Sequence, residues 1–191
     1  MDPLELFKEW YLEEKTLSGA ALPGACCLTT LGLDNFPNSR FVSLKEIKNG
    51  AFIITGLTDS RKGQEIAVDN KVALAFWWPC SAKQVRVQGV AVPIDPEEAA
   101  VYFAERDTAA QLVSVISRQG APLGDYDKMH EALREALAAG KHRQVARPEG
   151  WGGYAITPAR IELMRFSETR LHHRNLYEQK DGQWVQQQLQ P

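Results

Sequence analysis

The stretch RFVSLKEIKNGAFIIT, residues 40–55, decides the fold class that this sequence predicts. Residues 40–47 and 51–55 are rich in β-branched and other apolar side chains, which is typical of strands. Between them lies Asn49-Gly50, a dipeptide that favours the tight turn of a β-hairpin because both residues tolerate a positive φ. We therefore expect two neighbouring antiparallel strands at this place.

The same pattern of strands and short turns covers most of the chain. Residues 72–78 and 84–92 predict a second hairpin, and Asp181-Gly182 predicts the turn of a last one. Further strands are expected at residues 25–31, 152–156, 161–166 and 184–189. Because these strands rarely alternate with helices, the sequence predicts a mainly β chain with peripheral helices (α+β). We expect an antiparallel barrel in one domain over residues 1–191.

Helix start signals lie between these strands. Asp2-Pro3 and Asp95-Pro96 each combine a capping carboxylate with a proline in the first helical turn. Asp59 or Ser60 can also cap the start of a helix, here without a proline in the first turn. Helices are expected from residue 3 onward, from the Asp59 or Ser60 cap to residue 68, and at 96–106, 111–117 and 126–139, the last one ending at Gly140.

Composition limits the function classes. Of 191 residues, 44% are hydrophobic and 24% are charged, and the net charge is -2, so neither nucleic acid nor membrane is an expected partner. Any phosphate site must therefore be local. Cys26 and Cys27 are adjacent, so on a strand they point to opposite faces and suit neither a disulfide nor a metal site. With no apparent signal peptide, we expect free thiols, a cytoplasmic location and no metal.

Two groups of cations are candidates for a local phosphate site. Ser60-Arg61-Lys62-Gly63 combines a hydroxyl, two cations and the free N–H groups of a helix start, which suit a phosphate monoester. Such a start is also common on protein surfaces. Arg40 and Lys45 lie five residues apart on one predicted strand, so they face opposite sides unless a bulge lies between them.

The segment Arg170-Leu171-His172-His173-Arg174 is a third group of basic residues. On an extended strand, Arg170, His172 and Arg174 share a face and place an imidazole between two cations. This suits an anionic ligand that undergoes chemistry, and the alternative is a solvated edge strand. Gln84 enters an apolar strand, where it is either a strand-end residue or a donor to a flavin or pyrimidine carbonyl.

Taken together, blocks along almost the whole chain resemble the pyridoxamine 5'-phosphate oxidase family, which are flavin enzymes with an antiparallel split β-barrel. The blocks are DPLELFKEW, RFVSLK, TDSRKGQEI, NKVALAFWW, KQVRVQG, VYFAER, RPEGWGGY and RLHHR, with LQP at the end. Their order and spacing, and the RLHxR segment, carry the resemblance.

The resemblance implies FMN as the cofactor and a homodimer that shares its flavin sites. The positions that match flavin contacts are Arg40, Thr55, Arg61, Lys62, Gln84, Gln119 and Arg174. The positions that match the substrate phosphate are Lys45, Tyr102 and Arg106. Arg170 and His172 match the residues over the substrate ring, and are the expected catalytic residues.

The implied reaction is the oxidation of pyridoxamine or pyridoxine 5'-phosphate to pyridoxal 5'-phosphate, with dioxygen as the acceptor. The alternatives are a related FMN oxidase for another heteroaromatic substrate, and a flavin- or pyridoxal-phosphate-binding protein without turnover. The chain departs from the family pattern where a serine, a second serine, a tryptophan and an aspartate are usual. These positions hold Ala110, Gly120, Met164 and His173. The family's basic N-terminal lid segment is also expected to be missing, which leaves the flavin side better matched than the substrate side.

Overall fold

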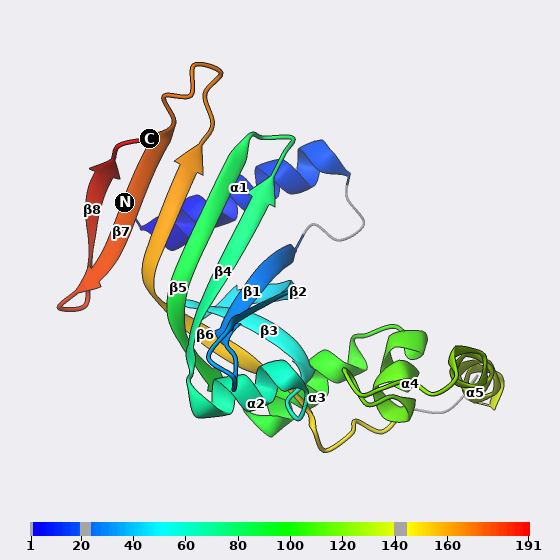
Figure 1. Cartoon of the computed structure of the whole chain (residues 1–191). Helices are drawn as coiled ribbons and strands as arrows, with labels where there is room; N and C mark the ends of the chain where they lie inside the picture. The colour runs from blue at the N-terminus through cyan, green and yellow to red at the C-terminus, as the bar shows by residue number, and fades with distance from the viewer. Residues whose placement is uncertain (1, 20–23, 140–144) are drawn as a thin grey trace.

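The structure, a computed structural model, describes residues 2–19, 24–139 and 145–191. Its strands form one antiparallel sheet in the order β3-β2-β1-β4-β5-β6-β7-β8, and β3 also pairs with β6 (Figure 1). This extra pairing closes β1 to β6 into a barrel, which β7 and β8 extend on one side. The strands are β1 (Ala25–Leu31), β2 (Pro37–Lys48), β3 (Ala51–Leu57), β4 (Lys71–Trp78), β5 (Lys83–Pro93), β6 (Trp151–Arg165), β7 (His173–Lys180) and β8 (Gln183–Leu189). The helices of the described residues are α1 (Pro3–Ser18), α2 (Arg61–Val68), α3 (Pro96–Ala104), α4 (Thr108–Ile116) and α5 (Tyr126–Ala139).

The hairpin from which the fold class was predicted is confirmed. β2 and β3 pair through Lys48 and Ala51, and Asn49 and Gly50 between them have φ of 50° and 78°. These are the positive values that a tight hairpin turn needs. The antiparallel barrel with peripheral helices is confirmed as well.

A β-bulge lies on β2 at Lys45. Leu44 pairs with Ile54 and Glu46 pairs with Ile53, so Lys45 is an extra residue without a partner on β3. A bulge changes which face the following side chains point to. This is the irregularity that the odd spacing of Arg40 and Lys45 required for both to serve one side of the sheet.

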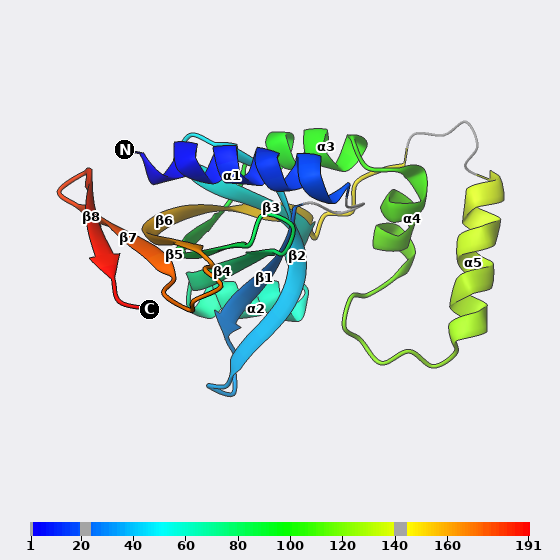
Figure 2. The ribbon, with the colours of Figure 1, turned by 90° about the horizontal axis from the view of Figure 1, so that it is seen from above.

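Helix α1 covers one end of the barrel (Figure 2). Asp2 caps it, since its carboxylate accepts from the N–H of Leu4 at 2.9 Å, as Asp2-Pro3 predicted. Phe7, fully buried, packs edge-on against Phe52 and Phe76, with ring centroids 5.0 and 4.9 Å away. The aromatic contacts join α1 to the barrel core and hold that end closed.

Helix α2 packs tightly behind the end of β3. An added Cβ on Gly63 would lie 1.9 Å from the carbonyl oxygen of Thr58, so only glycine allows this approach. Ser60 is the N-cap residue, but its side chain makes no capping hydrogen bond and instead donates to the Leu57 carbonyl at 2.6 Å. The first turn of α2 is thereby positioned with its backbone N–H groups uncapped by a side chain.

The other helices lie on the side opposite β8 (Figures 1 and 2). Helix α3 packs on β3 and β6, where its Tyr102 and Phe103 join a buried cluster with Trp151 of β6. The Gln111 amide at the start of α4 donates to the carbonyl of Phe103 at 2.9 Å, which ties α4 to α3. Helix α5 contacts α4 and contributes no buried residue. None of the helices in the described residues has the length and hydrophobicity that a membrane crossing requires.

Several boundaries differ from the prediction. The two strands predicted at residues 152–156 and 161–166 form one strand, β6, which ends at Arg165 and runs through the irregularity opposite Gln88 and Gly89. Helix α4 begins at Thr108, earlier than predicted, because Asp107 caps it. Gly140 lies outside the described residues.

The predicted strand over residues 170–174 is wrong. Arg170 has a φ of 66° and lies in a turn, in which its N–H donates to the Ser167 carbonyl at 3.0 Å. Strand β7 begins only at His173. The polar run at 167–169 forms the turn, with Ser167 and Thr169 hydroxyls 2.8 Å apart. Arg170, His172 and Arg174 therefore do not share one strand face.

Candidate functional site

The first turn of α2 holds a buried cation without a carboxylate partner. Only 8% of Lys62 is exposed. Its ammonium donates to Ser60 Oγ at 2.8 Å, Gln119 Oε1 at 3.0 Å and the Leu57 carbonyl at 3.3 Å, all neutral oxygens. Burial and the neighbouring Arg40 lower the pKa of Lys62. In the described residues no ion pair neutralises this charge, which leaves it available to an anion.

The other two cations predicted for the cofactor phosphate, Arg40 and Arg61, are already paired. Arg40 donates to Glu65 at 2.9 Å, and Arg61 bonds both Glu65 at 2.9 Å and Asp34 at 3.1 Å. Although burial raises the pKa of Glu65, hydrogen bonds from Thr30, Arg61, Asn38 and Arg40 outweigh it and lower the pKa to about 2. The sequence analysis did not single out Glu65, although its position four residues after Arg61 is the spacing of a helical ion pair. Arg61 and Arg40 thus share one fully buried carboxylate.

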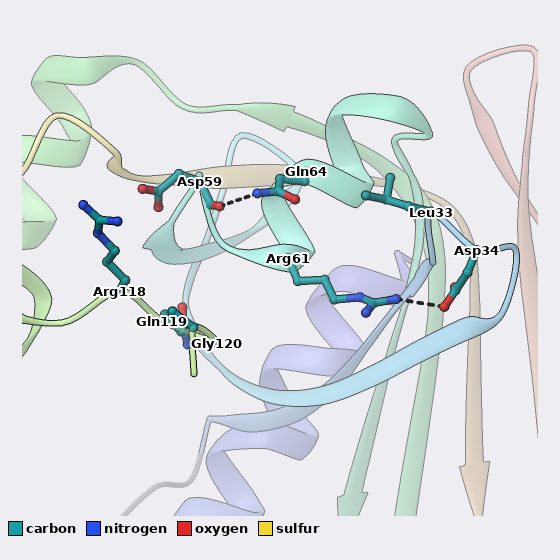
Figure 3. A pocket seen from close by; sticks show the side chains of 9 residues that line it. Leu33, Asp34, Asp59, Arg61, Gln64, Arg118, Gln119 and Gly120 are labelled. Atoms are coloured by element: carbon teal, nitrogen blue, oxygen red, sulfur yellow. Dashed lines mark hydrogen bonds and ion pairs between the residues drawn. The ribbon is translucent and has the colours of Figure 1, made fainter. Parts of the chain in front are cut away.

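A cavity of about 600 Å³ lies beside this turn, between α2 and residues 118–121 (Figure 3). Arg61, Arg118 and Gln119 line it, together with Asp34 and Asp59. Figure 3 shows Arg61 directed to Asp34 across the cavity edge, while Gln64 donates to the carbonyl of Asp59 at 2.9 Å. The cavity brings the α2 turn and Gln119, far apart in sequence, to one place.

A second group of predicted flavin positions forms a row across the sheet. Gln84 on β5 pairs with Met164 on β6, which pairs with Arg174 on β7. Directly paired residues of antiparallel strands share a face, so these side chains lie side by side. Arg174 donates to Glu162 Oε1 at 2.8 Å, and Arg86 donates to the other oxygen of that carboxylate at 3.0 Å. Glu162, only 7% exposed, is a second carboxylate that the sequence did not single out.

The positions that match the substrate phosphate meet at α3. The Lys45 ammonium lies 2.6 Å from Glu105 and 5.5 Å from the ring centre of Tyr102. The Tyr102 hydroxyl contacts Glu46 and donates to Glu98 at 2.9 Å; burial, followed by these two bonds, raises its pKa. The structure therefore brings Lys45 and Tyr102 together, but among carboxylates.

Arg106 and Thr55 contact other residues. Arg106 donates to Ser114 at 3.0 Å, and its guanidinium lies 5.3 Å from the ring centre of Trp151, where burial lowers its pKa. Thr55 is on β3 opposite Gly153. Thr55 precedes Gly56, where an added Cβ would lie 3.4 Å from Lys62 Nζ, so the end of β3 adjoins the buried cation.

The predicted catalytic pair lies in the turn before β7. His172 Nδ1 accepts from the N–H of Ser167 at 3.1 Å, and its ring packs edge-on against Phe166 with centroids 4.8 Å apart. This fixes the imidazole and assigns the proton of its neutral form to Nε2. Arg170 is exposed, and its guanidinium has no hydrogen bond or ion pair among the described residues. Both side chains are thus free to meet a ligand, from a turn and not from a strand.

Comparisons with known proteins identify the family. Residues 12–139 match the family model described as pyridoxamine 5'-phosphate oxidase, and residues 151–191 match the pyridoxine 5'-phosphate oxidase C-terminal dimerisation region. The second match supports the formation of a homodimer.

Relatives match over the whole chain. A pyridoxine/pyridoxamine 5'-phosphate oxidase of Bacteroides thetaiotaomicron is 35% identical and covers 100% of this chain and 89% of its own length. One of Caulobacter vibrioides is 37% identical, covering 100% of this chain and 85% of its own length.

Two solved structures share the fold. PhzG from Burkholderia lata 383, in complex with tetrahydrophenazine-1-carboxylic acid, has a TM-score of 0.92 at 28% identity, covering 100% of this chain and 93% of that one. A pyridoxamine 5'-phosphate oxidase-related, FMN binding protein from Nostoc punctiforme has a TM-score of 0.80 at 15% identity, over 100% and 98% of the two chains, and supports the fold alone. The family matches and the full-length relatives together place this chain in the pyridoxamine 5'-phosphate oxidase family, as an FMN-dependent oxidoreductase with a split-barrel fold.

Proposed function

We propose that this chain oxidises pyridoxamine and pyridoxine 5'-phosphate to pyridoxal 5'-phosphate, with FMN as cofactor and dioxygen as acceptor. The full-length likeness to oxidases of that name supports the reaction. The observation that carries the cofactor side is Lys62, a buried ammonium surrounded by neutral oxygens. We further propose that residues 1–191 work as one flavin-binding domain in the cytoplasm.

The donors around Lys62 fit the phosphate of FMN. A phosphate monoester carries up to two negative charges and accepts several hydrogen bonds. Lys62 offers an unneutralised cation, and the first turn of α2 offers backbone N–H groups that no side chain caps. Arg61 and Arg40 add positive charge beside it, although Glu65 balances part of that charge. Lys62 is therefore the residue on which we expect phosphate binding to depend most.

The row of Gln84, Met164 and Arg174 supports a flavin site shared between two copies. Met164 and Arg174 both belong to residues 151–191, the region that matches the dimerisation model. In a homodimer, residues of this region would reach the flavin held by α2 of the partner. Gln84 would then donate a hydrogen bond from its amide to the flavin ring, and Met164 would pack where the family has tryptophan.

At the substrate, the residues of this chain position the ring and exchange protons with it. When bound, FMN supplies the hydride acceptor and the reaction with dioxygen. Arg170 meets the substrate ring with a guanidinium that has no other partner among the described residues. His172, held by Ser167 and Phe166, presents Nε2 to the polar groups of the ring and can hold or release a proton there.

A second candidate substrate is a heteroaromatic that carries a carboxylate instead of a phosphate. The Lys45–Glu105 pair and Ala110, in place of the family's serine, weaken the case for a phosphate at this position. The solved relative at 28% identity was crystallised with a phenazine carboxylic acid. A binding protein without turnover is the third alternative.

The decisive experiment is an oxidase assay on the purified dimer. The proposal expects a flavin absorbance spectrum and the release of hydrogen peroxide, under air, when pyridoxamine or pyridoxine 5'-phosphate is added. Peroxide release with a reduced phenazine carboxylate, but with neither B6 phosphate, would replace the proposal by the second candidate. A flavin spectrum without turnover of any of these substrates would leave the binding protein.

A further inference from the structure

We propose that Glu105 is a specificity-determining residue, which holds Lys45 as an internal counterion and so weakens the binding of the substrate's phosphate. This inference rests on the proposed function, since it concerns the substrate side of the same site. It states that the carboxylate of Glu105 occupies the cation that a substrate phosphate would use. Removing that one charge should then increase the preference for phosphorylated ligands.

The contact between the two side chains carries the argument. Glu105 Oε2 lies 2.6 Å from Lys45 Nζ, within ion-pair distance, and Lys45 has no other ion pair among the described residues. The side chain of Lys45 is 34% exposed and that of Glu105 is 51% exposed, so an incoming ligand can reach the pair from solvent. A phosphate that approaches Lys45 must either displace this carboxylate or lie beside it.

The backbone keeps Glu105 at this place. It is the C-cap residue of α3, and its N–H donates to the Val101 carbonyl at 3.2 Å. Lys45, on the other side, is the bulged residue of β2. Because one partner is fixed by a helix end and the other by a bulge, displacement of the Glu105 side chain still leaves its negative charge within the site.

The neighbouring groups compensate for this charge only in part, through Arg106, whose guanidinium donates to the neutral Ser114 hydroxyl at 3.0 Å. The Tyr102 hydroxyl, which matches a phosphate contact, already contacts Glu46 and Glu98. Lys48 is paired with Glu98 at 2.7 Å. A dianion would therefore meet three carboxylates, whereas a ligand without phosphate avoids most of this repulsion.

The test compares binding of pyridoxal 5'-phosphate and of unphosphorylated pyridoxal to the FMN-loaded dimer. Dissociation constants are measured by ligand absorbance in buffer without phosphate, for the wild type, Glu105→Gln and a control. Glu131→Gln is the control, because Glu131 is a similarly half-exposed partner of Arg134 on α5. We expect Glu105→Gln to bind pyridoxal 5'-phosphate about three- to tenfold more tightly, to leave pyridoxal binding unchanged, and Glu131→Gln to change neither.

A second variant distinguishes the loss of the Glu105 charge from a structural effect of the substitution. In Glu105→Gln/Lys45→Gln the gain should disappear, because the cation that it depends on is gone. A ratio of the two dissociation constants that stays within about twofold of wild type in Glu105→Gln, or a gain that survives the loss of Lys45, would overturn the inference.

Turnover of pyridoxamine 5'-phosphate by the wild type, followed in parallel, separates the two proposals. Turnover with an unchanged ratio refutes the role of Glu105 alone. Absence of both turnover and pyridoxal 5'-phosphate binding in every variant refutes the proposed function together with this inference.

Discussion

Replacing Lys62 by methionine should remove most of the FMN affinity while leaving the fold intact. Methionine keeps an unbranched stem of similar length, which can remain packed against Gly56. The change removes only the ammonium, whose three partners are neutral oxygens. Leu57 keeps the hydrogen bond that Ser60 donates to its carbonyl, so the loop before α2 stays tied.

The expected size of the effect follows from that ammonium. A hydrogen bond to a charged group contributes about 1.5–3 kcal/mol net, which corresponds to a rise of about 10- to 150-fold in the dissociation constant of FMN. Arg61→Met is the matched control one residue away. The Arg61 guanidinium is 57% exposed and shared between Asp34 and Glu65, so its loss should raise the constant by less than about fivefold.

The assay is a titration of apoprotein with FMN, followed by the quenching of flavin fluorescence. Circular dichroism of each apoprotein checks that the barrel is retained. If Lys62→Met binds FMN within about twofold of wild type, or if Arg61→Met loses more affinity than Lys62→Met, the reasoning about an unneutralised buried cation is wrong.

Three further predictions concern the catalytic turn, acid stability and the departure at residue 173. Arg170→Leu should keep its flavin spectrum but lose turnover, by about tenfold for each 1.4 kcal/mol of lost transition-state stabilisation; unchanged peroxide release would contradict the proposed role. Because the folded state lowers the pKa of Glu65 from 4.5 to about 2, its contribution to stability is present above pH 4.5 and is lost as the pH falls toward 2. Urea unfolding between those pH values should show this loss in the wild type but not in Glu65→Gln, and equal slopes would exclude it. His173 pairs directly with Arg165 across β6 and β7, so His173→Asp should add an opposite-charge pair worth about 0.2–1 kcal/mol, measurable as a higher urea midpoint; a lower midpoint would speak against it.

Local sequence patterns were sufficient for the hairpin turns and the helix starts. Asn49-Gly50 and Asp2-Pro3 act through the backbone of a few neighbouring residues, so the same geometry forms whatever the rest of the chain does. The barrel followed from the succession of such short strands. The turn at residues 167–170 was not predicted, although Ser167 and Thr169 are residue types that favour turns.

The resemblance to the family could place candidate residues, but it could not say what surrounds them. Lys62 contacts Gln119 57 positions along the chain, and Arg40 contacts Glu65 25 positions along it. Tyr102 contacts Glu46 at a separation of 56 positions. No periodicity or motif reports on such pairs.

What the sequence by itself determined is therefore most of the helices and strands, the antiparallel hairpins and the cations that are candidates for phosphate binding. Only the tertiary structure decided which of those cations are free. Closing the barrel through β3 and β6 places α2 and α3 at its rim, where Glu65 neutralises Arg40 and Arg61. Lys62 has no ion pair among the described residues, and the carboxylate of Asp59 acts on it only from a longer distance. The physical reason is that charge balance depends on distances between side chains far apart in sequence, which only the packed chain sets.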